Sequence, residues 1–185
     1  MDRSKSSFQP VAACLTVLAA LVRLLPHPPN FAPIGSVALF GGARLRGWQA
    51  YLVPVLAMLL TDPILSHLAG APAYSWMTPV IYGCFLINVM LGRLLIRHSN
   101  SWTRIGGTAF LGSLQFYLIT NLFVWIHAAD LYPRTLAGLT ACYAAALPFF
   151  GRTVLGDLFY AALIFGVYSV LRNWEPNERS RRVTA

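Results

Sequence analysis

Residues 76–96 decide the fold. They read WMTPVIYGCFLINVMLGRLLI and contain a single charged residue, Arg93. A membrane-spanning helix needs about 20 predominantly apolar residues, so this stretch is long and apolar enough to cross a bilayer. Comparable apolar runs, some of them shorter, make up most of the chain on either side. They lie at residues 8–25, 33–43, 49–68, 105–127, 135–150 and 154–171.

The composition agrees with a membrane protein. Hydrophobic residues make up 57% of the 185 residues and charged residues 11%, against about 25% charged residues in soluble domains. The charges lie in short clusters between apolar runs, whereas a soluble helical protein spreads them along amphipathic faces. We therefore predict an all-α, polytopic integral membrane protein with the lipid bilayer as its main partner, rather than an unusually apolar soluble domain.

The net charge of +8 needs an explanation, because a basic surface is also typical of nucleic-acid binding. Here the basic residues flank the apolar runs, and no nucleic-acid motif is present. Lysine and arginine are retained on the cytoplasmic side of membrane proteins. We therefore attribute the excess charge to topology and predict no nucleic-acid partner.

The basic residues also indicate which of the shorter runs cross the membrane. With six crossings and both termini inside, eleven of the fourteen Lys and Arg residues fall on the cytoplasmic side. A seventh crossing by residues 135–150 would export the four arginines that follow residue 171, against the positive-inside rule. We therefore predict six transmembrane helices plus a short non-spanning helix packed at the outer face. Residues 1–172 form one membrane domain of a bacterial inner-membrane protein, and residues 173–185 form a polar cytoplasmic tail.

Unusual polar residues gather in the outer half of this topology. Asp62 lies near the outer end of the third helix, and Asp157 near the start of the sixth. Ionisable groups within the hydrocarbon are costly and indicate functional sites. A structural role is the alternative, in which each aspartate pairs with Arg23, Arg134 or Arg152 and ties helix ends together. Further candidates in this half are His27, Asn30, Asn88, Asn121, Arg152 and, within an expected aromatic belt, Trp125.

Cys84 is the most informative single residue. It lies in the outer half of the fourth helix, near Tyr82, Phe85 and Asn88. A lone membrane cysteine is usually a packing residue, but a thiolate is also a soft metal ligand. A single cysteine cannot hold a free ion such as zinc, so we predict no free metal ion. It remains open whether Cys84 is an axial ligand to a metal that a macrocycle already holds.

Four stretches together resemble the S components of energy-coupling-factor (ECF) vitamin transporters, which are small six-helix membrane proteins. The most specific is residues 23–34, RLLPHPPNFAPI. The others are residues 38–43 (ALFGGA), 60–62 (LTD) and 149–158 (FFGRTVLGDL). With a cysteine in the fourth helix, the chain is similar to the BtuM type, the solitary S components for cobalamin (vitamin B12).

The resemblance implies uptake of a vitamin through an outward-facing pocket. Cobalamin would be the bound substrate, with Cys84 as an axial cobalt ligand that could also promote loss of the upper cyano or alkyl group. The residues expected to contact the vitamin are His27, Asn30, Phe31, Asp62, Tyr82, Cys84, Phe85, Asn88, Asn121, Trp125, Arg152 and Asp157. Only Thr16 and Ala20 approximate the small-residue motif that docks an ECF energising module, so the sequence leaves open whether the protein is solitary.

Three other functions stay open. The chain could be an S component for another small vitamin that works with an ATP-driven ECF module. It could be a membrane enzyme acting on a lipid or isoprenoid, although no nucleophile–base pair is visible. It could also be a structural membrane subunit without a ligand. The concentration of polar groups at one membrane face argues against the last of these.

Overall fold

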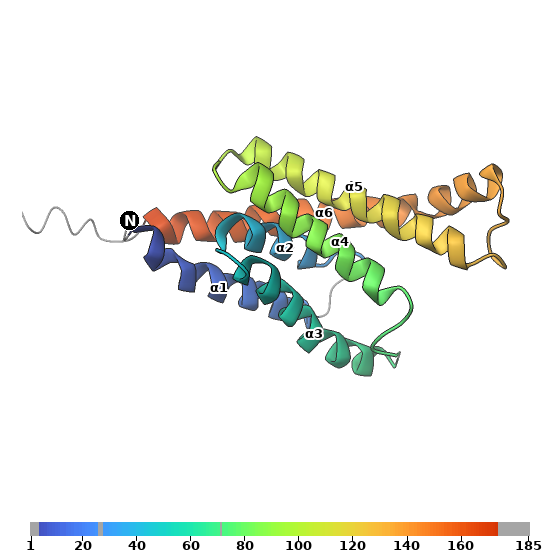
Figure 1. Ribbon diagram of the computed structural model, residues 1–185, viewed down its shortest axis with the longest axis horizontal. Coiled ribbons are helices and arrows are strands. Elements are labelled where there is room, and N and C mark those ends of the chain that lie inside the picture. Colours follow the sequence, from blue (N-terminus) through green and yellow to red (C-terminus); the bar gives the residue numbers. More distant parts are fainter. Residues whose placement is uncertain (1–3, 26–27, 71, 174–185) are drawn as a thin grey trace, which may run out of the picture.

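The computed structural model describes residues 4–25, 28–70 and 72–173, and the secondary structure in these ranges is helical, without a strand. Successive helices alternate in direction, so the start of α1 and the end of α6 lie at the same end of the molecule (Figure 1). The elements are α1 (Ser4–Val22), α2 (Ile34–Arg44), α3 (Gln49–Ala69), α4 (Thr78–Leu91), the π-helical turn η1 (Gly92–Ile96), α5 (Trp102–His127) and α6 (Leu136–Asn173).

Four helices are long and apolar enough to cross a bilayer: α3, α4 with η1, α5, and α6. Many of their leucines face outward, among them Leu60, which is 71% exposed, and Leu155. Large exposed apolar surfaces are rare on soluble proteins and are expected where a helix contacts lipid. The predicted all-α, multi-pass membrane protein is confirmed at this level.

The short helix α2 forms the centre of the bundle. Its residues from Ile34 to Ala43 are all buried, and it packs against every other helix. At 11 residues it is only about 16 Å long, well short of the hydrocarbon thickness of about 30 Å. The apolar run at 33–43 is therefore a buried core helix with little surface left to face lipid.

Two glycines let α2 approach the helix formed by α4 and η1. A Cβ added at Gly42 would overlap the carbonyl oxygen of Val89, and one at Gly92 would overlap the carbonyl oxygen of Leu39. Close contact of this kind between backbones is how small residues stabilise helix pairs in membranes. At the other side of α2, the Phe40 ring packs edge-on against Phe165 of α6.

The structure corrects the prediction of a separate outer-face helix at 135–150. Residues 136–173 form one helix, α6, that continues through Pro148. No residue between 148 and 153 has the positive φ that ends many helices, and a proline is tolerated in a membrane helix where neighbouring groups satisfy the freed carbonyl. Arg152 and Asp157 consequently lie inside α6 instead of flanking its start. At 38 residues α6 is about 57 Å long, and its first turns project beyond α3 and α4 (Figure 1).

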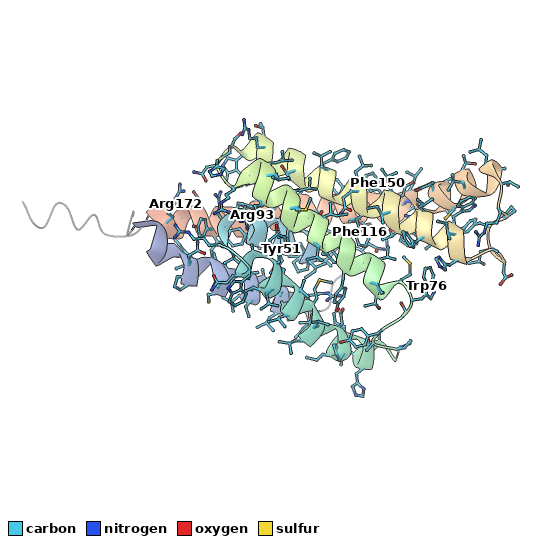
Figure 2. All side chains as sticks on the ribbon, in the orientation of Figure 1. Tyr51, Trp76, Arg93, Phe116, Phe150 and Arg172 are labelled. Atoms are coloured by element: carbon cyan, nitrogen blue, oxygen red, sulfur yellow. The ribbon has the colours of Figure 1, made fainter. Side chains whose placement is uncertain are left out.

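The two ends of the molecule differ in charge. We call the end that holds the start of α1 the basic end, because the α2–α3 and α4–α5 connections there carry arginines (Figure 1). Figure 2 shows Arg93 and Arg172 toward this end and Trp76 near the opposite end. Residues 174–185, which include most of the predicted tail, lie outside the described residues.

The pair Thr16 and Ala20 faces inward. Thr16 is 0% exposed and donates a hydrogen bond to the Ala12 carbonyl, and Ala20 is 1% exposed. Their small size therefore serves contact between α1 and its own bundle. The sequence alone left open whether such contact would be internal or with a partner.

Candidate functional site

A cavity of about 310 Å³ lies between α5 and α6, lined from the middle and second half of α5 and from the first half of α6. Asn30 from the α1–α2 connection completes its wall. Figure 2 labels two of its aromatic members, Phe116 on α5 and Phe150 on α6. As far as the structure describes the lining, it holds no charged side chain. The lining residues are Asn30, Ser113, Phe116, Tyr117, Thr120, Asn121, Ala146, Phe149, Phe150 and Thr153.

The Pro28-Pro29-Asn30-Phe31 segment positions Asn30 by a tight turn. The Phe31 N–H donates to the Pro28 carbonyl at 3.0 Å, and Asn30 has φ 65°. Proline at the second position and a positive φ at the third are the signature of a type II turn, and asparagine tolerates that conformation better than most residues. The Phe31 ring then packs on Phe159 and Tyr160 of α6. The turn thus anchors the connection to α6 with Asn30 at the cavity.

Several polar groups of the lining are already used within the protein. Thr120 and Thr153 each donate to a carbonyl of their own helix, and Tyr117 donates to the Tyr143 carbonyl at 2.7 Å. The Asn121 amide nitrogen donates to the Tyr117 carbonyl at 2.8 Å, but its side-chain oxygen has no hydrogen bond to a described residue. The side chain of Asn30 has none either. The cavity therefore offers the amide of Asn30 and the amide oxygen of Asn121 between aromatic walls.

Asp157 lies directly behind this cavity and is 4% exposed. Ser113, which lines the cavity, donates to Asp157 Oδ2 at 2.6 Å, and Ser36 Oγ donates to the Asp157 backbone carbonyl at 2.7 Å. The carboxylate itself lies against the first turn of α2, so close to Gly35 that a Cβ there would overlap it. Asp157 therefore caps the N-terminus of α2, whose first N–H groups have no partner within the helix. The positive end of that helix stabilises the negative charge.

Asp62 belongs to a separate cluster that joins α1, α3 and α4. Its carboxylate forms an ion pair with Arg23 at 2.5 Å and accepts a hydrogen bond from the Tyr82 hydroxyl at 2.6 Å. Arg23 also donates to Thr61 at 3.2 Å. The structural interpretation of Asp62, pairing with Arg23, is confirmed. For Asp157 no arginine contact exists among the described residues, and the helix cap described above takes its place.

Cys84 does not line the cavity. It is 1% exposed, and the described residues form no hydrogen bond with its thiol. The neighbouring Phe85 ring packs on Phe116 at 5.4 Å, and Phe116 does line the cavity. Gln115 of α5 donates both to the Cys84 carbonyl and to Asn88 Oδ1, each at 3.0 Å. Cys84 and Asn88 thus belong to the packed contact between α4 and α5.

The remaining predicted site residues are dispersed. Trp125 donates from its indole to the Pro133 carbonyl at 3.0 Å, and the Arg134 guanidinium lies over its ring. Arg134 also donates to the Ile126 carbonyl. Arg152 is exposed on α6. His27 lies outside the described residues. Of the twelve predicted contact residues, the structure therefore places Asn30 and Asn121 at the cavity and Asp157 behind it.

The sequence interpretation missed most of the cavity wall. On α5, the missed residues are Ser113, Phe116, Tyr117 and Thr120. Together with Asn121 they recur at spacings of three and four, which places them on one helix face. That polar and aromatic stripe within an otherwise apolar helix is a signal that could have revealed the wall. On α6, Phe149, Phe150 and Thr153 belong to the stretch 149–158 that was singled out above.

The sequence profile of DUF6580, a family of unknown function, matches residues 4–178. The chain belongs to this family. The DUF6580 match extends over every helix of the structure, so the whole bundle, including the buried α2 and the long α6, is the family's unit. Neither a curated protein nor a solved structure matches the chain.

Proposed function

We propose that this protein binds a vitamin-sized, uncharged solute between α5 and α6 and takes part in its uptake across the bacterial inner membrane. In this proposal the chain crosses the bilayer six times with both termini in the cytoplasm, as in the ECF S components that the sequence resembles. The connections on either side of the short α2 complete its crossing. The observation that carries the proposal is the cavity of about 310 Å³ with the unbonded amide of Asn30 and the unbonded amide oxygen of Asn121. Because most of the Lys and Arg residues that the structure describes lie at the basic end, that end would face the cytoplasm. The cavity would then open toward the outside.

The lining favours a particular class of solute. Phe116, Tyr117, Phe149 and Phe150 offer flat apolar surfaces, and the amides provide a donor and an acceptor that fix orientation. A charged group would find no opposite charge in the lining that the structure describes. Ligand sites usually enclose about 300–1,000 Å³, so this cavity suits a small ring-containing molecule with amide, hydroxyl or carbonyl groups.

Binding to the purified protein tests this proposal. A panel of water-soluble vitamins is titrated in detergent micelles against the wild type and against Asn121→Leu, which keeps the side-chain size but removes the amide. Loss of one hydrogen bond should weaken binding by up to about tenfold. Thr140→Val, which removes an exposed hydroxyl of α6 that bonds to its own helix, is the matched control. Equal affinity of Asn121→Leu and the control would contradict the assignment of the site.

Cobalamin is a second candidate ligand, and the observation that favours it is the Cys84 thiol. It is a soft metal ligand that no described residue engages by a hydrogen bond. A complete corrinoid exceeds the cavity, so this ligand requires the packing around α4 to open and uncover the buried thiol. The Phe85–Phe116 contact and the two Gln115 hydrogen bonds would have to open.

The visible spectrum of cyanocobalamin tests this second candidate. If Cys84 ligates cobalt, the wild-type protein shifts the spectrum, and Cys84→Ala neither shifts it nor binds tightly. Cys142→Ala serves as the control, because Cys142 is also buried but lies on α6. An unchanged affinity and spectrum in Cys84→Ala would remove cysteine ligation while leaving the binding of a smaller solute at Asn121 intact.

A further inference from the structure

A second hollow of about 410 Å³ lies on the outside of the bundle, between η1 and the first half of α5. Leu94 and Leu95 form one wall and Leu111 belongs to the other, while Arg104 lies at the basic end. Thr108 is also in the lining, but its hydroxyl donates to the Arg104 carbonyl of its own helix at 2.7 Å. The hollow is thus an apolar groove with one positive charge at its end.

Gly107 also lines this groove. A Cβ added at this position would meet nothing within 4 Å, so the absence of a side chain is not required by packing within the bundle. This differs from Gly42 and Gly92, where a Cβ would overlap a backbone atom. Gly107 therefore leaves open a space that the bundle itself does not fill.

The charge of Arg104 is not used within the described part of the chain. The ion pair found there joins Arg23 and Asp62, and the side chain of Arg104 has no hydrogen-bond partner among the described residues. Arg44, by contrast, donates to Asn100 Oδ1 at 2.8 Å and lies over the ring of Phe165. Arg104 is exposed and available to an external anion.

Trp102 indicates the depth at which this anion would lie. It is 54% exposed and precedes Arg104 by two residues at the start of α5. Exposed tryptophans of membrane proteins lie at the headgroup level, so Arg104 lies at that level too. The leucines of the groove extend from there toward the hydrocarbon. This order, charge at the interface and apolar wall below it, matches a phospholipid rather than a free anion.

We infer that this groove is a binding site for an anionic glycerophospholipid. The phosphate pairs with Arg104, and one acyl chain lies over Gly107 against Leu94, Leu95 and Leu111. Basic pockets on the cytoplasmic side of membrane helices bind anionic headgroups in this manner. The site is separate from the cavity between α5 and α6. It rests on the proposed orientation of the basic end but not on the solute proposed for that cavity.

Native mass spectrometry of the purified protein tests the site, with palmitoyl-oleoyl phosphatidylglycerol and the matching phosphatidylcholine as probes. The wild type should retain phosphatidylglycerol in preference to phosphatidylcholine. Arg104→Gln should lower this preference about fivefold, the effect of one basic residue near an anionic headgroup, and Arg104→Lys should restore most of it. Arg46→Gln, an exposed arginine in the α2–α3 connection at the same end, should behave as the wild type.

Gly107→Leu tests the groove itself. It should lower retention of both lipids, whereas Gly151→Leu should not, because Gly151 also faces open space but lies on α6. The proposal is overturned if Arg104→Gln matches Arg46→Gln, or if Gly107→Leu matches Gly151→Leu. It is also overturned if glycerol 3-phosphate displaces phosphatidylglycerol at equal concentration, because the acyl chain would then contribute nothing.

Discussion

Asp62 and Asp157 show two ways of keeping a carboxylate inside a membrane protein. Asp62 has an arginine, Arg23, and the Tyr82 hydroxyl as partners, and its side chain is 13% exposed. Asp157 is more deeply buried, accepts a hydrogen bond from the Ser113 hydroxyl and lies against the start of α2. An arginine near a helix end can extend its charged group toward the headgroups, whereas deeper in the bundle a helix N-terminus supplies positive potential without a buried cation.

The two carboxylates also differ in whether they are linked to the cavity. The Asp62 cluster joins three helices, and its members bond to one another and not to the cavity. Its expected role is therefore to tie α1, α3 and α4 together. Asp157 performs a structural role as well, but its partner Ser113 also lines the cavity. A ligand in the cavity would therefore touch a residue that is bonded to the cap of the central helix. The predictions below test whether these two carboxylates differ in the expected way.

Removing the Asp157 carboxylate should have the largest effect. Asp157→Ala leaves the N-terminus of α2 without its cap and deprives Ser113 of the closer of its two acceptors. Together these losses should lower the free energy of unfolding by about 3 kcal/mol. Asp157→Asn keeps an acceptor and should lose less. Denaturant unfolding in detergent micelles measures both variants. A loss below about 0.5 kcal/mol in Asp157→Ala, the range of ordinary surface substitutions, would show that the cap is unimportant.

Gly35→Ala should be the next most damaging change. The added methyl group overlaps Asp157 Oδ1, and overpacking of this kind costs about 1–3 kcal/mol. The cost should shrink when the same change is made in an Asp157→Ala background, because the overlapping atom is then gone. The double-mutant cycle measures this coupling. Strictly additive effects would place the clash elsewhere.

Ser113→Ala should lower the free energy of unfolding by about 1.5 kcal/mol, because the lost hydrogen bond has a charged acceptor. Ser66→Ala, on the last turn of α3, is the control. The solute affinity of Ser113→Ala should also change, since this hydroxyl lies in the cavity wall. Loss of stability with unaltered affinity would limit Ser113 to its structural role.

The Asp62 cluster should give the smallest effect. Arg23→Gln should lower the free energy of unfolding by about 0.5–1 kcal/mol, as expected for an ion pair that water can still reach. Tyr82→Phe should lose a similar amount through its single hydrogen bond. Thermal unfolding in detergent, monitored by circular dichroism, checks both variants. If Arg23→Gln proved as damaging as Asp157→Ala, the distinction between the two carboxylates would fail.

The contrast between Asn121 and Cys84 shows how far residue-level prediction reached. Both were proposed from depth along their helices, which hydropathy and charge reveal. Asn121 lines the cavity, whereas Cys84 is buried outside the cavity lining. Depth can be read along one helix, but the direction of a side chain depends on how neighbouring helices are rotated about their own axes. That rotation is set by contacts such as the one between Asn88 and Gly112, where a Cβ would lie 2.7 Å from Asn88 Oδ1.

By itself the sequence determined that this is an all-α, multi-pass membrane protein, and it indicated most of the helices. Those properties follow from the hydropathy of consecutive residues, because each apolar segment that is long enough can cross the bilayer as a helix. Only the tertiary structure decided that α2 is buried at the centre, that residues 136–173 form one helix, and that Asp157 caps α2. The hydrogen bond from Ser36 to Asp157 joins residues 121 positions apart. No local pattern encodes such a contact, because it exists only once the helices have packed.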